Sequence, residues 1–299
     1  MELKQLRYFL AVAEELNFTR AAAKVGIAQP PLSQQILILE RQLGKPLFVR
    51  TKRKVELTPA GEILVERARR IINLCEEVSE DIAATDGPQI RHLRMGAIYT
   101  IISLLAPQLF RACRRDIPAL RIDFREMTAP QQFEALRDGA IDIAVIRGMM
   151  EGTLFCTRKL FDEPFVAALP DTLAEPGATV TPDWLARQDF IWMTRATNTH
   201  YDNLFRLLPV PLNDRLNVVQ TTTDMHTMLC LVAAGIGVAL VPRATSTTPI
   251  KGITYRGIEG DIPHSSVSVY WRREDDDPLL LRVIELIAAI AETMHVADD

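Results

Sequence analysis

The sequence predicts an α/β protein that begins with a winged helix-turn-helix and continues through one long helix into a larger α/β domain. Three observations indicate this order. Two short helical patterns separated by a glycine precede two short strand patterns within residues 1–58. Helical periodicity then runs from residue 59 to about residue 85, and strand and helix patterns alternate beyond residue 92. A chain of 299 residues has room for two or three compact units.

Residues 18–40 form the predicted helix-turn-helix. Thr19 is the expected N-cap of a first helix, which Gly26 ends by taking a left-handed conformation. Pro30 and Pro31 suit the first turn of a second helix, because N–H groups there have no helical partner. The apolar stripe of this second helix comprises Leu32, Ile36, Leu39 and Leu43. Its opposite face suits a DNA major groove, where amides read base edges and hydroxyls bond phosphates. The expected DNA contacts on the helices are Thr19, Gln29, Pro30, Pro31, Ser33, Gln34 and Arg41. The alternative is a helical hairpin packed in an ordinary core.

A two-stranded wing is predicted after the helices, with strands at residues 46–50 and 54–58. The expected inward-facing residues are Leu47, Val49, Val55 and Leu57. The tip between the strands is basic, so its cations are placed to meet phosphates or a minor groove. Arg50, Lys52 and Arg53 are therefore predicted to contact DNA.

Residues 1–65 resemble the winged helix-turn-helix of LysR-type transcriptional regulators. The matching residues are Leu6, Phe9, Phe18, Ala21, Ala22, Gln29, Pro30, Leu32, Ser33, Ile36, Leu39, Glu40, Leu43, Gly44, Leu47, Phe48, Arg50, Leu57, Thr58, Ala60 and Gly61. The family usually has a serine before the Gln-Pro pair. Ala28 stands there in this chain, so the N-cap bond is expected to be missing. Residues 28–33 resemble the variant of the catechol- and benzoate-responsive branch, which implies an effector of that kind.

Charge is divided unevenly along the chain. Residues 1–58 contain five Lys and five Arg against five Glu and no Asp, a balance of +5. The whole chain carries −4, so the remainder carries −9. This asymmetry indicates a nucleic-acid-binding module joined to an acidic domain, which repels DNA and leaves the basic end as the contact surface.

Composition and motif content also indicate the cellular compartment and whether a catalytic, metal or cofactor site is expected. No run of 18 apolar residues is present, and charges at Glu2, Lys4 and Arg7 break any apolar N-terminal segment. We therefore expect a cytoplasmic protein without a membrane span. Four widely spaced cysteines, Cys75, Cys113, Cys156 and Cys230, are interpreted as reduced, buried thiols. No metal-ligand spacing, phosphate loop or nucleophile motif occurs, so no metal, cofactor or catalytic residue is predicted. A metabolite enzyme with a helical appendage and a solute-binding protein remain the alternatives.

Residues 59–87 are predicted to form a linker helix that Thr58 caps and that Pro59 begins. An apolar seam recurs at three- and four-residue steps through Leu64, Arg67, Ile71, Leu74, Val78 and Ile82. Too little neighbouring chain is available to bury this seam, which favours a homodimer. The alternative is a helix folded onto its own effector domain. The LysR resemblance implies dimerisation through this helix, a homotetramer, and RNA polymerase as a further partner.

Residues 88–299 are predicted to form a two-lobed α/β domain. Expected strands are 93–98, 120–125, 141–146, 165–169, 190–193, 218–221, 237–241 and 267–271, and expected helices are 103–114, 130–138, one near 184, 201–207, 224–234 and 279–294. Lobe I is expected at about 91–161 and 266–299, and lobe II at about 162–265. Crossovers near 161–163 and 263–266 would leave a cleft between them. The resemblance implies a fold similar to periplasmic binding proteins.

In open α/β sheets, ligands bind beyond the carboxyl ends of the strands, beside helix N-termini. This rule predicts effector contacts from Tyr99, Thr100, Ile101, Thr128, Ala129, Arg147, Thr194, Asn198, His200 and Thr223. Hydroxyl groups and free helix N–H groups suit a carboxylate, and Arg147 adds a bidentate cation. The resemblance also assigns effector contacts to Thr100, to Thr128 or Ala129, and to Arg147. An aromatic or unsaturated carboxylate is therefore the expected effector. The alternatives are simple N-capping by the threonines and a surface ion pair at Arg147.

Overall fold

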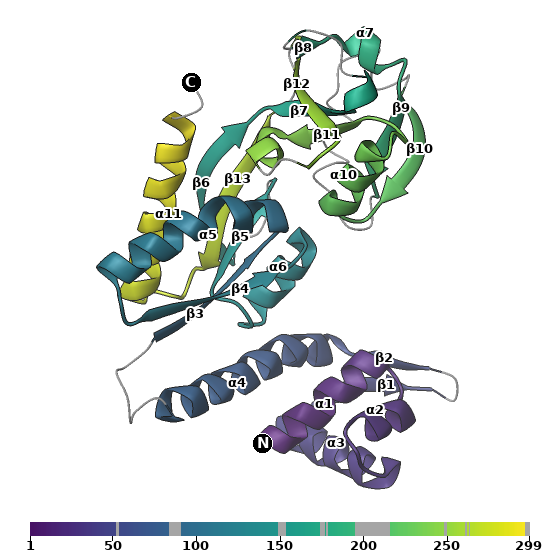
Figure 1. Ribbon diagram of the computed structural model, residues 1–299. Coiled ribbons are helices and arrows are strands. Elements are labelled where there is room, and N and C mark those ends of the chain that lie inside the picture. Colours follow the sequence, from purple (N-terminus) through teal and green to yellow (C-terminus); the bar gives the residue numbers. More distant parts are fainter. Residues whose placement is uncertain are drawn as a thin grey trace. The chain divides into compact units, whose positions relative to one another are not determined.

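The computed structural model describes residues 1–51, 54–83, 91–148, 154–173, 177, 179–194, 216–247, 250–260, 262 and 264–296. The chain divides into two compact units (Figure 1). The first comprises residues 1–91 with 134–141, and the second comprises residues 92–133 with 142–299. None of the described helices combines the length and the apolar character needed to cross a membrane.

The first unit contains a helix-turn-helix, a wing and a long helix. Its elements are α1 (Leu3–Glu15), α2 (Phe18–Lys24), α3 (Gln29–Leu43), β1 (Phe48–Arg50), β2 (Val55–Leu57) and α4 (Pro59–Ala83). Phe9 of α1 and Leu32, Ile36 and Leu39 of α3 are fully buried in one core. The predicted stripe of α3 is thus confirmed except at Leu43, which is 41% exposed because the helix ends there.

The turn between α2 and α3 differs from the prediction at its cap. Asn17, not Thr19, is the N-cap of α2, since its Oδ1 accepts hydrogen bonds from Thr19 N at 2.9 Å and Arg20 N at 3.0 Å. Gly26 has the expected left-handed conformation, with φ of 71°. Ala28 is the N-cap of α3 and makes no side-chain capping bond, as expected.

The wing consists of β1 and β2 paired antiparallel, with Phe48 opposite Leu57. The prediction that Val49 faces inward is wrong, since Val49 is 48% exposed. Phe48 takes the inward position instead. Its ring lies 5.4 Å from that of Phe9 and 5.8 Å from that of Phe18.

The first turn of α4 is capped as predicted, because Thr58 Oγ1 accepts a hydrogen bond from Gly61 N at 3.0 Å. Residues 134–141 belong to this unit through Asp138. Arg69 Nη1 donates to Asp138 Oδ2 at 2.6 Å, and Asn73 Nδ2 donates to the Asp138 carbonyl at 2.8 Å.

The apolar seam of α4 is only partly covered in the single chain. Leu64 and Ile71 pack against the core of the first unit. Leu74, Val78 and Ile82 are 59%, 49% and 65% exposed. The C-terminal half of the seam is therefore open to a partner.

Lobe I of the second unit is built on a five-stranded sheet with the order β4-β3-β5-β13-β6. The strands are β3 (Arg91–Ala97), β4 (Leu120–Glu126), β5 (Ile143–Arg147), β6 (Phe155–Glu163) and β13 (Ser265–Arg272). The helices are α5 (Tyr99–Asp116), α11 (Pro278–Val296) and the start of α6 (Ala129–Arg137), whose residues 134–137 belong to the first unit. Residues of α5, α11 and the sheet share one core. Strand β6 was not predicted, and the crossover expected at 161–163 is instead the end of β6, paired with β13.

Lobe II is built around β7 (Phe165–Pro170), which lies in a four-stranded sheet of order β11-β7-β12-β8. Its other elements are η1 (Asp171–Leu173), β8 (Thr179–Val180), α7 (Pro182–Leu185), β9 (Asp189–Met193), β10 (Asn217–Thr222), α10 (Met225–Ala233), β11 (Ala239–Pro242), η2 (Arg243–Thr247) and β12 (Ile253–Ile258). Strands β9 and β10 pair in parallel, and a second core fills this lobe. Strand β12 was not predicted, and the helix expected at 201–207 lies outside the described residues.

Candidate nucleic-acid interface and effector site

The outward face of α3 is polar. The exposed predicted residues of α2 and α3 are Thr19, Gln29, Pro30, Pro31, Gln34 and Arg41, and Ser33 is half-buried. Gln29 Nε2 donates to Ser33 Oγ at 2.8 Å, which orders both groups along one face. Arg41 Nε donates to the Leu37 carbonyl at 3.2 Å, which leaves the other N–H groups of Arg41 for a phosphate. The buried stripe and this polar face together present a helix suited to groove binding.

Arg50 is bonded within the first unit. Its Nη2 lies 3.4 Å from Glu40 Oε2, and its guanidinium carbon lies 4.4 Å from the ring centre of Phe18. Glu40 also accepts hydrogen bonds from the N–H groups of Leu47 and Phe48 at 2.8 and 3.3 Å. Arg50 therefore holds the wing against α2 and α3, so its charge is largely compensated before any DNA arrives.

The base of the wing turn is fixed by Thr51, whose N–H donates to the Lys54 carbonyl at 2.9 Å. Lys54 is paired with Glu56. The other two predicted wing contacts, Lys52 and Arg53, lie outside the described residues.

Arg147 ends β5 in lobe I and is 6% exposed. Its Nη1 donates to Glu163 Oε1 and, at 2.9 Å, to Ser265 Oγ. Glu163 Oε2 accepts a further bond of 2.6 Å from Ala244 N in η2. The alternative of a surface ion pair at Arg147 is wrong, because both partners are buried. Glu163 and Ser265 were not predicted from the sequence, since no local pattern relates them to Arg147.

This network leaves one edge of the Arg147 guanidinium unbonded. Nε and Nη2 are buried and have no hydrogen-bond partner among the described residues. These two N–H groups form an edge that pairs with both oxygens of a carboxylate. An unpaired buried donor costs about 1–3 kcal/mol, more when charged. A bound carboxylate would relieve that cost.

Thr100 stands at the same edge of the sheet as Arg147. Helix α5 begins at Tyr99, four residues earlier than predicted, so Thr100 lies in its first turn. Strands β3 and β5 are parallel neighbours, with Ala97 opposite Val145, so Thr100, just after β3, and Arg147, the last residue of β5, both lie at the carboxyl ends of these strands. Thr100 Oγ1 is buried and has no partner within the described part of the chain. Simple N-capping does not account for this hydroxyl.

Two further positions predicted in lobe I are used by the fold itself. The side chain of Ile101 is fully buried in the core, and its N–H donates to the Ile98 carbonyl. Thr128 Oγ1 donates to Gln131 Oε1 at 3.0 Å, so the hydroxyl of Thr128 is engaged at the start of α6. Tyr99 is 47% exposed.

The remaining predicted positions are spread over the second unit. Ala129 is half-buried at the first position of α6. Thr194 N donates to the Thr222 carbonyl at 2.8 Å, and Thr223 is exposed. Asn198 and His200 lie outside the described residues. Arg147 and Thr100 are thus the predicted pair that the fold brings together.

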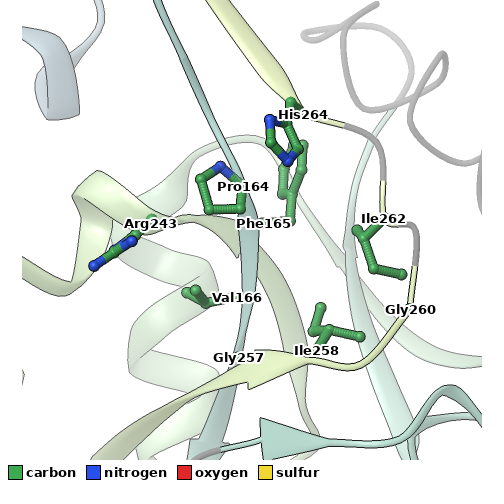
Figure 2. A pocket seen from close by; sticks show the side chains of 9 residues that line it. All are labelled: Pro164, Phe165, Val166, Arg243, Gly257, Ile258, Gly260, Ile262 and His264. Carbon is green, nitrogen blue, oxygen red and sulfur yellow. The ribbon is translucent and has the colours of Figure 1, made fainter. Parts of the chain in front are cut away.

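A pocket of about 410 Å³ lies in lobe II beside the two chain crossovers, and none of the predicted effector positions lines it. Its lining residues are Pro164, Phe165, Val166, Arg243, Gly257, Ile258, Gly260, Ile262 and His264. Figure 2 shows apolar side chains on most of this wall, with the guanidinium of Arg243 extending away from Ile258 and Ile262. The pocket therefore lacks the set of buried donors found at Arg147.

A winged helix with an exposed polar reading face, joined to a two-lobed α/β domain with buried donors, defines a DNA-binding regulator with a ligand-binding domain. Residues 3–62 match the family described as bacterial regulatory helix-turn-helix protein, lysR family, and residues 86–291 match the LysR substrate binding domain. The chain belongs to the LysR family of transcriptional regulators. It is a regulator and not an enzyme.

Relatives and solved structures cover nearly the whole chain. The chain is 35% identical to the regulator CatR of Pseudomonas putida over 292 residues, covering 98% of this chain and 100% of CatR. It is 32% identical to the Hca operon transcriptional activator HcaR of Escherichia coli K12, and the match covers 96% of this chain and 97% of HcaR. The structure of CbnR, a LysR family regulator, is similar to this one with a TM-score of 0.70 at 26% identity, and the match covers 97% of this chain and 99% of the CbnR chain. In a complex of full-length CbnR with its target DNA, the CbnR chain matches with a TM-score of 0.69 at 26% identity, over 97% of this chain and 100% of that chain.

Proposed function

We propose that this regulator responds to a small aromatic or unsaturated carboxylate, bound between the two lobes with its carboxylate on the free edge of Arg147. The observation that carries the proposal is the pair of buried, unpartnered N–H groups at Nε and Nη2. The similarity of this chain to CatR and the sequence of residues 28–33 also favour an aromatic or unsaturated carboxylate as the effector.

On the DNA side, we propose that the chain binds promoter DNA as a homodimer through α4, assembled further into a homotetramer. Gln29 and Gln34 would read base edges, while Ser33, Arg41 and the basic wing tip would bond phosphates. The open half of the α4 seam supports the dimer. We also propose that the chain acts as a transcriptional activator, with RNA polymerase as its further partner.

The effector proposal is tested by thermal denaturation of the full-length chain with benzoate, muconate and the neutral isostere benzamide. The carboxylates should raise the melting temperature, because a ligand that binds only the folded state stabilises it. Benzamide should not. Arg147→Lys keeps a charge for Glu163 but loses the planar edge, so it should abolish most of the shift.

Arg158→Lys is the matched control, since Arg158 forms a surface ion pair with Glu285. It should behave as wild type. The proposal is overturned if neither carboxylate shifts the wild type, or if Arg147→Lys responds as fully as the control.

A further inference from the structure

Thr245 has a buried hydroxyl that the local fold does not use. It is the middle residue of η2 and is 4% exposed. Ser246 Oγ donates to the Arg243 carbonyl and Thr247 Oγ1 to the Ala244 carbonyl, each at 2.8 Å. Thr245 Oγ1 has no hydrogen-bond partner among the described residues. Burying a hydroxyl without a hydrogen-bond partner is costly, and a hydrogen bond from Thr245 to a bound ligand would offset that cost.

The contacts of η2 place Thr245 beside the Arg147 network. Ala244, the residue before Thr245, donates its N–H to Glu163, which pairs with Arg147. Helix η2 also packs against α5, which carries Thr100 in its first turn. Four of the seven buried side-chain N and O atoms without a partner in the described part of the chain belong to Arg147, Thr100 and Thr245.

These four atoms match the hydrogen-bonding capacity of one carboxylate. Its two oxygens accept about four hydrogen bonds. Arg147 Nε and Nη2 supply two, and the hydroxyls of Thr100 and Thr245 supply the other two. We infer that Thr245 is the fourth donor to the effector carboxylate, which rests on the proposed function and adds a contact from lobe II. Arg147 and Thr100 belong to lobe I, so the carboxylate is held from both lobes and its binding favours the lobe arrangement in which all four donors converge.

The test measures benzoate affinity by isothermal titration of the full-length chain. Thr245→Val replaces the hydroxyl with a methyl group of similar shape. It should weaken benzoate binding about tenfold or more, as expected for a hydrogen bond to a charged group. Thr247→Val, two residues away in η2, should stay within about twofold of wild type. Without ligand, Thr245→Val should melt no lower than wild type, because it removes an unpaired polar group.

The outcomes separate the two proposals. Unchanged benzoate affinity in Thr245→Val, together with weakened affinity in Arg147→Lys, overturns the role of Thr245 alone. A ligand-free melting temperature several degrees below wild type also overturns it, since the hydroxyl would then have a partner in the protein. Failure of wild type to bind either benzoate or muconate overturns the carboxylate effector itself and this inference with it.

Discussion

Arg147 and Glu163 form a buried ion pair between the last residues of β5 and β6, two strands of one sheet that β13 separates. Their side chains are only 4% and 8% exposed. The pair crosses over the start of β13, where Ser265 adds a hydrogen bond to Arg147. One crossover between the lobes begins at this network, because Pro164 follows Glu163, and the other ends there, because Ser265 opens β13.

Removing Glu163 should destabilise the second unit strongly. Glu163→Ala leaves the guanidinium of Arg147 buried without a counter-charge, a change that costs about 3–5 kcal/mol. Urea unfolding at pH 7 measures this loss. The control is Glu285→Ala, which breaks the exposed pair with Arg158 and should cost about 0–1 kcal/mol. Equal losses in the two variants would show that the Arg147 pair is not buried in solution.

The Asp162 carboxylate should make a pH-dependent contribution to the free energy of unfolding. Burial by itself raises the pKa of Asp162, but hydrogen bonds from Lys159 and Ser266 and the nearby charges outweigh it and hold the pKa below its ordinary value. Because the folded pKa lies below the unfolded one, the stabilisation is present above the unfolded value of about 4 and is lost as the pH falls through the folded value. The gap in unfolding free energy between wild type and Asp162→Asn should therefore be constant at pH 5–7 and shrink below pH 4. A gap that stays constant down to pH 3 would contradict the claim that the ionised Asp162 carboxylate stabilises the folded protein.

The open seam of α4 predicts a charge-sensitive dimer. Leu74→Glu places a carboxylate in the stripe that Leu74, Val78 and Ile82 expose, where a partner helix would have to bury it. Light scattering after gel filtration should show a smaller assembly than wild type at the same concentration. Ser79→Glu adds the same charge to an exposed position away from the stripe and should leave the mass unchanged. Equal masses for all three proteins would place the dimer contact elsewhere.

The two parts of the DNA interface should respond differently to substitution. Gln34→Ala should narrow the affinity difference between operator and scrambled duplex by about 1–3 kcal/mol, as expected for a lost base contact. Arg53→Ala should weaken binding to both duplexes and reduce the salt slope by about 1, as expected for a lost phosphate contact. Fluorescence anisotropy over a salt series measures both. An unchanged salt slope in Arg53→Ala would remove the wing tip from the interface.

Local sequence patterns predicted the presence of the described helices and the buried parallel strands, because each depends on residues close together in the chain, although α5 begins four residues before its predicted start. The strand β6 was missed because Arg158 and Lys159 interrupt its alternation, and its pairing with β13 joins residues more than a hundred positions apart. The same separation hid the partners of Arg147. The rule about strand ends found Arg147 and Thr100, but burial and bonding, which decide what each group can still bind, became apparent only in the fold. Thr245 lies after a strand that the sequence did predict, yet nothing local distinguishes it from Ser246 or Thr247.

The cysteines differ in exposure, which contradicts the expectation of four buried thiols. Cys113 is buried, whereas Cys230 is exposed on the outer face of α10, with its Sγ 3.7 Å from His226 Nε2. Burial, together with the charge of Asp116, raises the pKa of Cys113, so its thiolate is scarce near neutral pH. A disulfide reagent should therefore modify Cys230 first and Cys113 only on unfolding. Cys230→Ser should abolish the fast phase and Cys113→Ser should preserve it; a fast phase that survives Cys230→Ser would mean that another thiol is open in solution.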